Sequence, residues 1–373
     1  MNQDRRYFLR CAAATAAASA ISLPAGHAWA QAPEQRHFAP EPGNWRTFDV
    51  TTRVDIAFPE GPTQVWLPVP SVESDWQRSL TSSVQTNGAA RFVEDGLYGV
   101  RMLHVTFEKS GATPYVELTS RVQTRNRQAD FTRRGHAPAA DAASLHFWTR
   151  PTRLLPTDGI VRETALKATQ GARTDREKVR AIYDWVVANT YREPKVRGCG
   201  EGDIKTMLET GNLGGKCADL NAIFVGLCRA TGVPARDVYG LRLAPSAFGY
   251  KELGANSASL KGAQHCRAEV YLAGLGWVAM DPADVAKVQR QETAEWIKTT
   301  DHPVVAPVNR ALYGGWEGNW VGWNMGHDLA LPGAQGPELG FLMYPVAETG
   351  GQRVDSYNPD DFKYQISARD ITA

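Results

Sequence analysis

The sequence has little cysteine, almost no net charge and no internal repeat. Four of the five cysteines among its 373 residues lie in the second half, and their spacing fits neither a C-x-x-C pair nor a zinc site. The cysteine pattern therefore does not indicate a zinc centre. The formal net charge of +1 gives no reason to expect nucleic acid or an anionic membrane as a partner. At 43% hydrophobic and 22% charged residues, the chain can bury substantial cores.

Long hydrophobic runs are also lacking. The apolar run "CAAATAAASAISLPAG" near the start is too short and too rich in alanine to span a bilayer stably. It follows "DRRYFLR" and precedes "AWA", which ends at Ala30. This order is typical of a twin-arginine export signal over residues 1–30, cleaved after Ala30. We therefore expect a periplasmic or secreted mature chain, 31–373, with no integral membrane segment after cleavage and a net charge near −1, because the signal carries three arginines and one aspartate.

The mature chain is expected to begin with β-structure. Residues 31–45 are rich in proline and polar residues and are typical of a linker. In "FDVTTRVDIAF" and "YVELTSRVQT" apolar residues alternate with polar ones, and turn signals such as "PEGP" separate the runs. The pattern predicts a small antiparallel β domain over 46–127.

The next segment, 144–295, mixes helical and strand-like patterns. Thr174 and Glu177 have the spacing of a capping box and precede a helical apolar face. A shorter helix near 203–210 leads into glycines and then into a helix starting at Cys217. Strand-like runs follow, which predicts an α+β domain. The remaining residues, 296–373, have few clear periods, and we expect them to form an extension that packs on this core.

Cys217 lies at the start of its predicted helix, in "GGKCADLNAIFVGLCRATGVPAR". It shares the buried stripe with apolar residues three, six, seven and ten positions later. A helix N-terminus has unpaired N–H groups and a partial positive charge, which favour a thiolate and can bind an oxyanion. A buried structural thiol is the alternative, so the position alone does not assign a role.

A histidine and an aspartate occur together in "HCRAEVYLAGLGWVAMDPADV". Its two β runs are joined by "AGLG", which predicts a hairpin. With a turn centred on Ala273, His265 and Asp281 lie directly opposite each other, and their Cβ atoms are about 5 Å apart. The other face is then almost wholly apolar, which supports this pairing. It includes Cys266, which we therefore expect in the core.

Cys217, His265 and Asp281 together form a possible nucleophile, base and orienting carboxylate. His265 would take the thiol proton or hold it in an ion pair, and Asp281 would fix the imidazole tautomer. Taken singly, His265 could be a hydrogen-bonded strand residue and Asp281 a residue that ends a strand. Their joint occurrence with Cys217 favours a catalytic triad that transfers an acyl group through a thioester.

The three motifs "GGKCADLNAIFVGLCRATGVPAR", "HCRAEVYL" and "GWVAMDPADV", in this order, resemble the transglutaminase-like superfamily of papain-type cysteine enzymes. The resemblance covers about residues 150–290. It implies a helix carrying Cys217 packed on an antiparallel sheet with His265 and Asp281, and no metal or organic cofactor. The calcium-site acidic clusters of the animal enzymes have no clear counterpart here. Members include transglutaminases, proteases, amidases and inactive scaffolds, so the resemblance indicates mechanism more than substrate.

We therefore expect a thiol-dependent acyl-transfer enzyme acting on amides of a peptide or protein. Hydrolysis is our first choice. Protein-glutamine transamidation is the alternative, and a catalytically silent binding scaffold is a second class.

Other residues leave their roles open. Cys199 could line the cleft, form a disulfide or remain an unpaired loop thiol, whereas Cys228 is expected in the core. Asn212 or Gln264 could donate to an oxyanion. The tryptophan-rich segment 314–328 could form a substrate rim, but packing on the core is the more common outcome.

Overall fold

The computed structural model describes residues 36–56, 60–108, 112–132, 140–358 and 362–372. The predicted export signal and the first part of the predicted linker lie outside this range. Residues 35–373 form one compact unit. Within the described residues, no helix has the length and apolar character that crossing a membrane requires.

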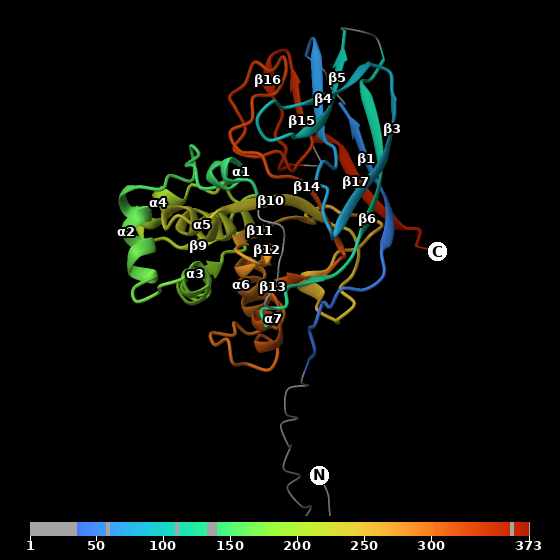
Figure 1. Cartoon of the computed structure of the whole chain (residues 1–373). Coiled ribbons are helices and arrows are strands. Elements are labelled where there is room, and N and C mark those ends of the chain that lie inside the picture. The colour runs from blue at the N-terminus through green and yellow to red at the C-terminus, as the bar shows by residue number, and fades with distance from the viewer. Residues whose placement is uncertain (1–35, 57–59, 109–111, 133–139, 359–361, 373) are drawn as a thin grey trace, which may run out of the picture. The chain divides into compact units, whose positions relative to one another are not determined.

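The centre of the fold is an antiparallel sheet that carries the predicted hairpin (Figure 1). Helix α5 (Cys217–Ala230) packs against two of its strands, β10 and β11. Apolar residues of α5, including Ile223, Phe224 and Leu227, share one core with Val270 of β11. The six strands, in spatial order, are β14 (Trp320–Asn324), β10 (Ala235–Arg242), β11 (Gln264–Leu272), β12 (Gly276–Met280), β13 (Tyr313–Trp316) and β7 (Arg127–Gln128).

The remaining helices surround α5 or follow the hairpin. The predicted capping box is confirmed: Thr174 caps α3, and Glu177 bonds back to the Thr174 N–H. Helices α2 and α3 pack on α5. The other helices are α1 (Ala142–Phe147), α2 (Gly159–Ala168), α3 (Asp175–Asn189), α4 (Ile204–Thr210), α6 (Pro282–Gln291), α7 (Ala306–Ala311) and the 3-10 turn Lys251–Leu253.

Two further antiparallel sheets contain the strands of the N-terminal region (Figure 1). Alternate residues of β1 and β6 are buried, as the period of two predicted. One sheet has the order β17 (Tyr364–Asp370), β1 (Arg46–Asp55), β6 (Tyr115–Thr124) and β3 (Gln77–Thr86). The other has the order β16 (Gln352–Arg353), β15 (Val346–Thr349), β2 (Thr63–Pro68), β5 (Arg101–Phe107) and β4 (Ala89–Glu94).

The predicted α+β class is confirmed: a helix that begins at Cys217 packs on an antiparallel sheet, and antiparallel β-structure precedes it in the chain. The segment 296–373 contributes strands to all three of these sheets. Strands β13 and β14 join the central sheet, β15 pairs with β2 and β17 pairs with β1, while β16 pairs with β15 at the sheet edge. The division at residues 46–127, 144–295 and 296–373 stays a prediction.

The hairpin pairing differs from the predicted one by one residue at its centre. Leu272 pairs with Gly276, so the turn is centred on Gly274 and not on Ala273. Gly274 and Gly276 have φ values of 81° and 78°, a left-handed conformation that glycine adopts without steric cost. These glycines fix the turn one position later. Each residue therefore pairs with a residue two positions later than predicted. Because side chains alternate between faces with a period of two, the predicted division of the hairpin into two faces is retained.

The tryptophan-rich segment is part of the core. Trp316, Trp320 and Trp323 are all buried, on or directly beside the sheet's strands β13 and β14. The Trp320 indole N–H donates to the backbone carbonyl of His265 at 2.8 Å. The segment therefore supports the strand that carries His265.

Candidate active site

Cys217 is the first residue of α5 and is only 3% exposed. Residues Gly214–Gly215 form the short strand β9, which pairs in parallel with β8 (Tyr191–Arg192). This pairing places Arg192 beside Gly215, two residues before the thiol. The first turn of the helix thus begins directly after a fixed stretch of backbone.

The carboxylate of Asp219 holds the two backbone segments that meet at Cys217. It accepts hydrogen bonds from the N–H groups of Lys216, Glu201 and Gly202 at 2.9, 3.0 and 2.9 Å. The neighbouring Gly200 has a φ of 89°, and a Cβ atom there would lie 1.8 Å from the Asp219 carboxylate. Only glycine leaves room for this bonding.

His265 and Asp281 are in contact, as expected, although they are not paired across the hairpin. Asp281 follows the last residue of β12 and caps α6, and one of its oxygens accepts from the Asp284 N–H at 3.1 Å. Its other oxygen lies 2.8 Å from His265 Nε2. Asp281 therefore both ends a strand and bonds the imidazole, so the two readings of this residue are compatible.

The structure brings Cys217 next to His265 in a buried, polar setting. Burial alone raises the pKa of the Cys217 thiol, but hydrogen bonds with Cys199, Cys266 and His265 outweigh it and hold the pKa well below its ordinary range. Burial and Arg242 lower the pKa of His265, yet the carboxylates of Asp284 and Asp281 raise it to about 9. The lowered pKa of the thiol and the raised pKa of the imidazole both favour a thiolate–imidazolium pair at neutral pH.

A second carboxylate, Asp284, was not predicted. It lies 3.3 Å from His265 Nε2 and forms a buried ion pair with Arg242 at 2.5 Å. Although burial disfavours its charged form, Arg242 and His265 hold the pKa of Asp284 well below its usual value. The sequence did contain a signal, because Asp284 occupies the third position after a capping aspartate and thus the first turn of a helix.

Two further residues orient the Asp281 carboxylate. Asn221 of α5 donates to the Cys266 carbonyl at 2.8 Å and to Asp281 at 3.3 Å. Arg267 Nε lies 3.5 Å from Asp281, and its guanidinium carbon lies 5.3 and 4.7 Å from the ring centroids of Trp316 and Trp320. Helix α5 therefore positions both the thiol and, through Asn221, the carboxylate.

The buried cluster is balanced in charge when the thiol is ionised. Its cations are the imidazolium of His265 and the guanidinium groups of Arg242 and Arg267, and its anions are the carboxylates of Asp281 and Asp284 and the thiolate. Because unpaired charge is costly in a protein interior, the balance itself favours the ionised thiol. His265, Asp281 and Asp284 present possible metal ligands within 4.8 Å of one another, but guanidinium groups already compensate both carboxylates.

Two other thiols contact Cys217. Cys199 lies in the preceding loop; its sulfur lies 3.3 Å from the Gln264 carbonyl oxygen and accepts from the Tyr344 hydroxyl at 3.0 Å. Cys266 is fully buried, as predicted, but it lies on the sheet face that α5 covers and its thiol meets Cys217. Hydrogen bonds with Cys217 and burial raise the pKa of both thiols. All four cysteines in the described residues are free.

Gln264 and Asn212 occupy different places relative to the thiol. Gln264 is among the residues that line the cavity at Cys217, and neither its side-chain oxygen nor its nitrogen has a partner among the described residues. Asn212 is exposed and does not line that cavity. A buried amide without partners can donate to a bound oxyanion, so Gln264 is the better placed of the two candidates.

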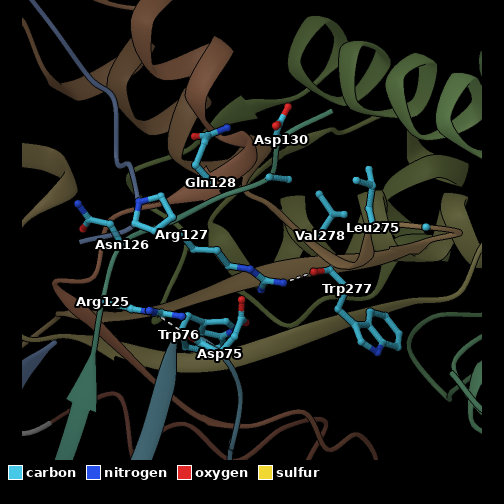
Figure 2. Close-up of a pocket in the computed structure, with 13 residues that line it drawn as sticks. Asp75, Trp76, Arg125, Asn126, Arg127, Gln128, Asp130, Leu275, Trp277 and Val278 are labelled. Carbon is cyan, nitrogen blue, oxygen red and sulfur yellow. Dashed lines mark hydrogen bonds between the residues drawn. The ribbon is translucent and has the colours of Figure 1, made fainter. Parts of the chain in front are cut away.

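A separate cavity of about 310 Å³ lies at the hairpin turn and β7 (Figure 2). Figure 2 shows Arg127 reaching across it to the backbone of Trp277, and Arg127 also pairs with Glu269. This cavity shares no lining residue with the one at Cys217, and neither cysteine nor histidine lines it. Its central charge is already paired, so it has no group suited to nucleophilic chemistry.

Comparison with known proteins agrees with this geometry. The model of the Transglutaminase-like superfamily matches residues 162–282. A Haemophilus influenzae protein named "Uncharacterized protein" is 33% identical over 342 residues, covering 87% of this chain and 91% of that protein. The solved structure of a "Putative Cysteine Protease" from Cytophaga hutchinsonii has a TM-score of 0.56 at 16% identity, covering 89% of this chain and 93% of that one. At 16% identity, the similarity to the Cytophaga hutchinsonii structure shows a shared fold alone.

Proposed function

The chain belongs to the transglutaminase-like superfamily, and from this we propose that it is a thiol-dependent acyl-transfer enzyme that hydrolyses amides of peptides or proteins. The observation that carries the proposal is the buried contact of Cys217 with His265, in which the pKa of the thiol is lowered and that of the imidazole is raised to about 9. A structural thiol in a protein core has the opposite shift, as burial raises the pKa of Cys228.

The reaction would have two half-reactions. The Cys217 thiolate attacks the amide carbonyl carbon, and the C–N bond breaks as His265 gives its proton to the leaving amine. Gln264 and the backbone N–H of Cys217 would stabilise the oxyanion, since the N–H groups of Lys216 and Ala218 already donate to Asp219 and to the Cys199 carbonyl. Water then attacks the thioester and loses a proton to His265. The C–S bond breaks, releasing the carboxylic acid and restoring the thiolate–imidazolium pair. Asp281 would keep the imidazole in position throughout.

Hydrolysis is favoured over transamidation by the charge around the thiol. Lysine and arginine side chains line the cavity, and none of its lining residues is acidic. A protein amine acceptor is a lysine, which approaches as an ammonium ion and is repelled by this lining. Water is not repelled. A non-enzymatic scaffold, in contrast, would have no need for a balanced thiolate–imidazolium pair.

The test uses peptide mixtures and a substitution of the thiol. Wild-type protein and Cys217→Ala are incubated with a complex peptide mixture, with and without a large excess of a primary amine, and products are identified by mass spectrometry. We expect new peptide termini with the wild type alone, and few products that carry the amine. Amine adducts in place of cleavage would establish transamidation. Identical product sets for wild type and Cys217→Ala would contradict the enzyme and favour the scaffold.

Export remains part of the proposal. It is supported by the twin arginines and the cleavage pattern ending at Ala30. Replacing Arg5 and Arg6 with lysine should leave the protein in the cytoplasmic fraction of cells that export the wild type.

A further inference from the structure

The cavity at Cys217 has an unusual charge distribution. It has a volume of about 270 Å³ and lies between the loop at Cys199, the start of α5, the loop before β11 and the C-terminal tyrosines. None of its lining residues is aspartate or glutamate, whereas five are basic: Arg192, Lys216, Arg242, Lys261 and Lys287. Such a lining raises the local concentration of anions.

Two of these cations are already paired. Arg242 binds Asp284 at 2.5 Å, and Lys287 lies 3.3 Å from a carboxylate oxygen of Glu252. Arg192 and Lys216 differ: in the described ranges, neither has a carboxylate within 4.0 Å. Arg192 donates to the Gln291 side-chain oxygen at 2.9 Å, which satisfies a hydrogen bond but leaves its charge uncompensated.

Backbone pairing brings these two cations together next to the thiol. Lys216 directly precedes Cys217, and β8 places Arg192 beside Gly215. Burial and the nearby Arg192 lower the pKa of Lys216, and the charges of Cys199, Cys217 and Asp219 offset this only in part. Two like charges held together in a half-buried site cost free energy unless an anion joins them.

The thiolate attracts Lys216, but its charge is already balanced by other cations of the buried cluster. Hydrogen bonds with Cys199, Cys266 and His265 stabilise it, and His265, Arg242 and Arg267 balance the three buried anions. Arg192 and Lys216 are additional to that balance. They therefore fit an anion that arrives with the substrate.

We propose that Arg192 and Lys216 form a subsite for a carboxylate of the substrate, so that the preferred acyl donor is an acidic peptide with its carboxylate close to the scissile amide. The proposal rests on the proposed function, since it concerns the substrate of the same thiol. A carboxylate is the anion that peptides carry, either at the C-terminus or on an aspartate or glutamate side chain. A guanidinium and an ammonium group suit it well.

The test compares two alkylating reagents that differ in charge. Iodoacetate and iodoacetamide attack the same thiolate, so the ratio of their rates cancels any change in the pKa of Cys217 and reports attraction of the anion. In Arg192→Gln/Lys216→Gln, the iodoacetate-to-iodoacetamide ratio at Cys217 should fall about tenfold, the order expected for removing two charges within a few ångströms. Lys167→Gln, an exposed lysine that does not line the cavity, is the matched control and should leave the ratio unchanged.

Each outcome has a definite meaning. An unchanged ratio in the double variant, with Cys217 still reactive to iodoacetamide, overturns the carboxylate subsite and leaves the proposed function standing. A wild-type Cys217 that is inert to both reagents contradicts the proposed function and the subsite with it. Lys216→Glu, a second variant, should lower the ratio further than Lys216→Gln does, and an equal effect of the two contradicts the proposal.

A second experiment asks whether the recognised carboxylate is the C-terminus of the peptide or an acidic side chain. It measures how strongly different peptides protect Cys217 from alkylation by iodoacetamide. Acetyl-trialanine with a free C-terminus is compared with its amide, and an acetylated, amidated peptide with central glutamate is compared with its glutamine counterpart. Stronger protection by the free acid assigns the C-terminal carboxylate, and stronger protection by the glutamate peptide assigns a side chain. Equal protection by acids and amides argues against recognition of a carboxylate.

Discussion

Replacing His265 with alanine is expected to slow alkylation of Cys217 by iodoacetamide at pH 6.5 about hundredfold. Without the imidazolium, burial should raise the pKa of the thiol, so that only a small fraction of it would be thiolate at this pH. The wild-type thiol, whose pKa is held well below the ordinary range, is expected to be largely ionised. The rate is measured by mass spectrometry of the peptide that contains Cys217.

His146→Ala is the control for this experiment, because His146 is exposed on α1 and far along the chain from the thiol. Alkylation of Cys217 in that variant should match the wild type. Asp281→Asn keeps the imidazole but removes a carboxylate that raises the pKa of His265. This variant should therefore also slow alkylation of Cys217. If folded His265→Ala, checked by circular dichroism, reacts as fast as the wild type, the imidazole does not activate the thiol.

Arg242→Met is expected to destabilise the protein by about 3–5 kcal/mol, the cost of removing the guanidinium partner of a buried carboxylate. Asp284 is 1% exposed, and Arg242 binds it at 2.5 Å while also donating to the Leu253 carbonyl. Methionine fills most of the volume of the Arg242 side chain but cannot compensate the charge of Asp284. The free energy of unfolding is measured by urea denaturation.

An exposed ion pair provides the matched comparison. Arg180 and Asp184 form an i,i+4 pair on α3 with both side chains about half exposed, and Arg180→Met should cost less than about 1 kcal/mol. The double variant Arg242→Met/Asp284→Leu should recover much of the lost stability, since it removes the unpaired charge. Equal decreases in the free energy of unfolding for Arg242→Met and Arg180→Met would show that the buried ion pair does not stabilise the site.

The local signals in the sequence predicted the elements well. The capping box at Thr174, the helix at Cys217 and the alternating strands all depend on residues close together in the chain, where periodicity and capping chemistry act directly. The face assignment of the hairpin was also correct, because a shift of two residues preserves it. The predicted centre of the turn was wrong, since it depended on which glycines adopt a positive φ.

The electrostatic surroundings of the site could not be predicted in the same way. Arg242 and Asp284 are 42 residues apart, and Asn221 meets Asp281 from a helix 60 residues earlier. Nothing in the local pattern of either partner points to the other, because their contact arises from the packing of α5 and α6 at the central sheet. The same holds for Cys266, whose alternation placed it in the core but did not show that its thiol meets Cys217.

The most direct measurement is the pH dependence of iodoacetamide labelling of the four cysteines in the folded protein. The lowered pKa of Cys217 means that its thiolate is present above that pKa and is lost only as the pH falls through it. Cys217 should therefore react fast at or below pH 7, while Cys199, Cys228 and Cys266, whose pKa values are raised, remain unlabelled. A Cys217 that reacts only above about pH 8.5, as a free thiol does, would contradict the account.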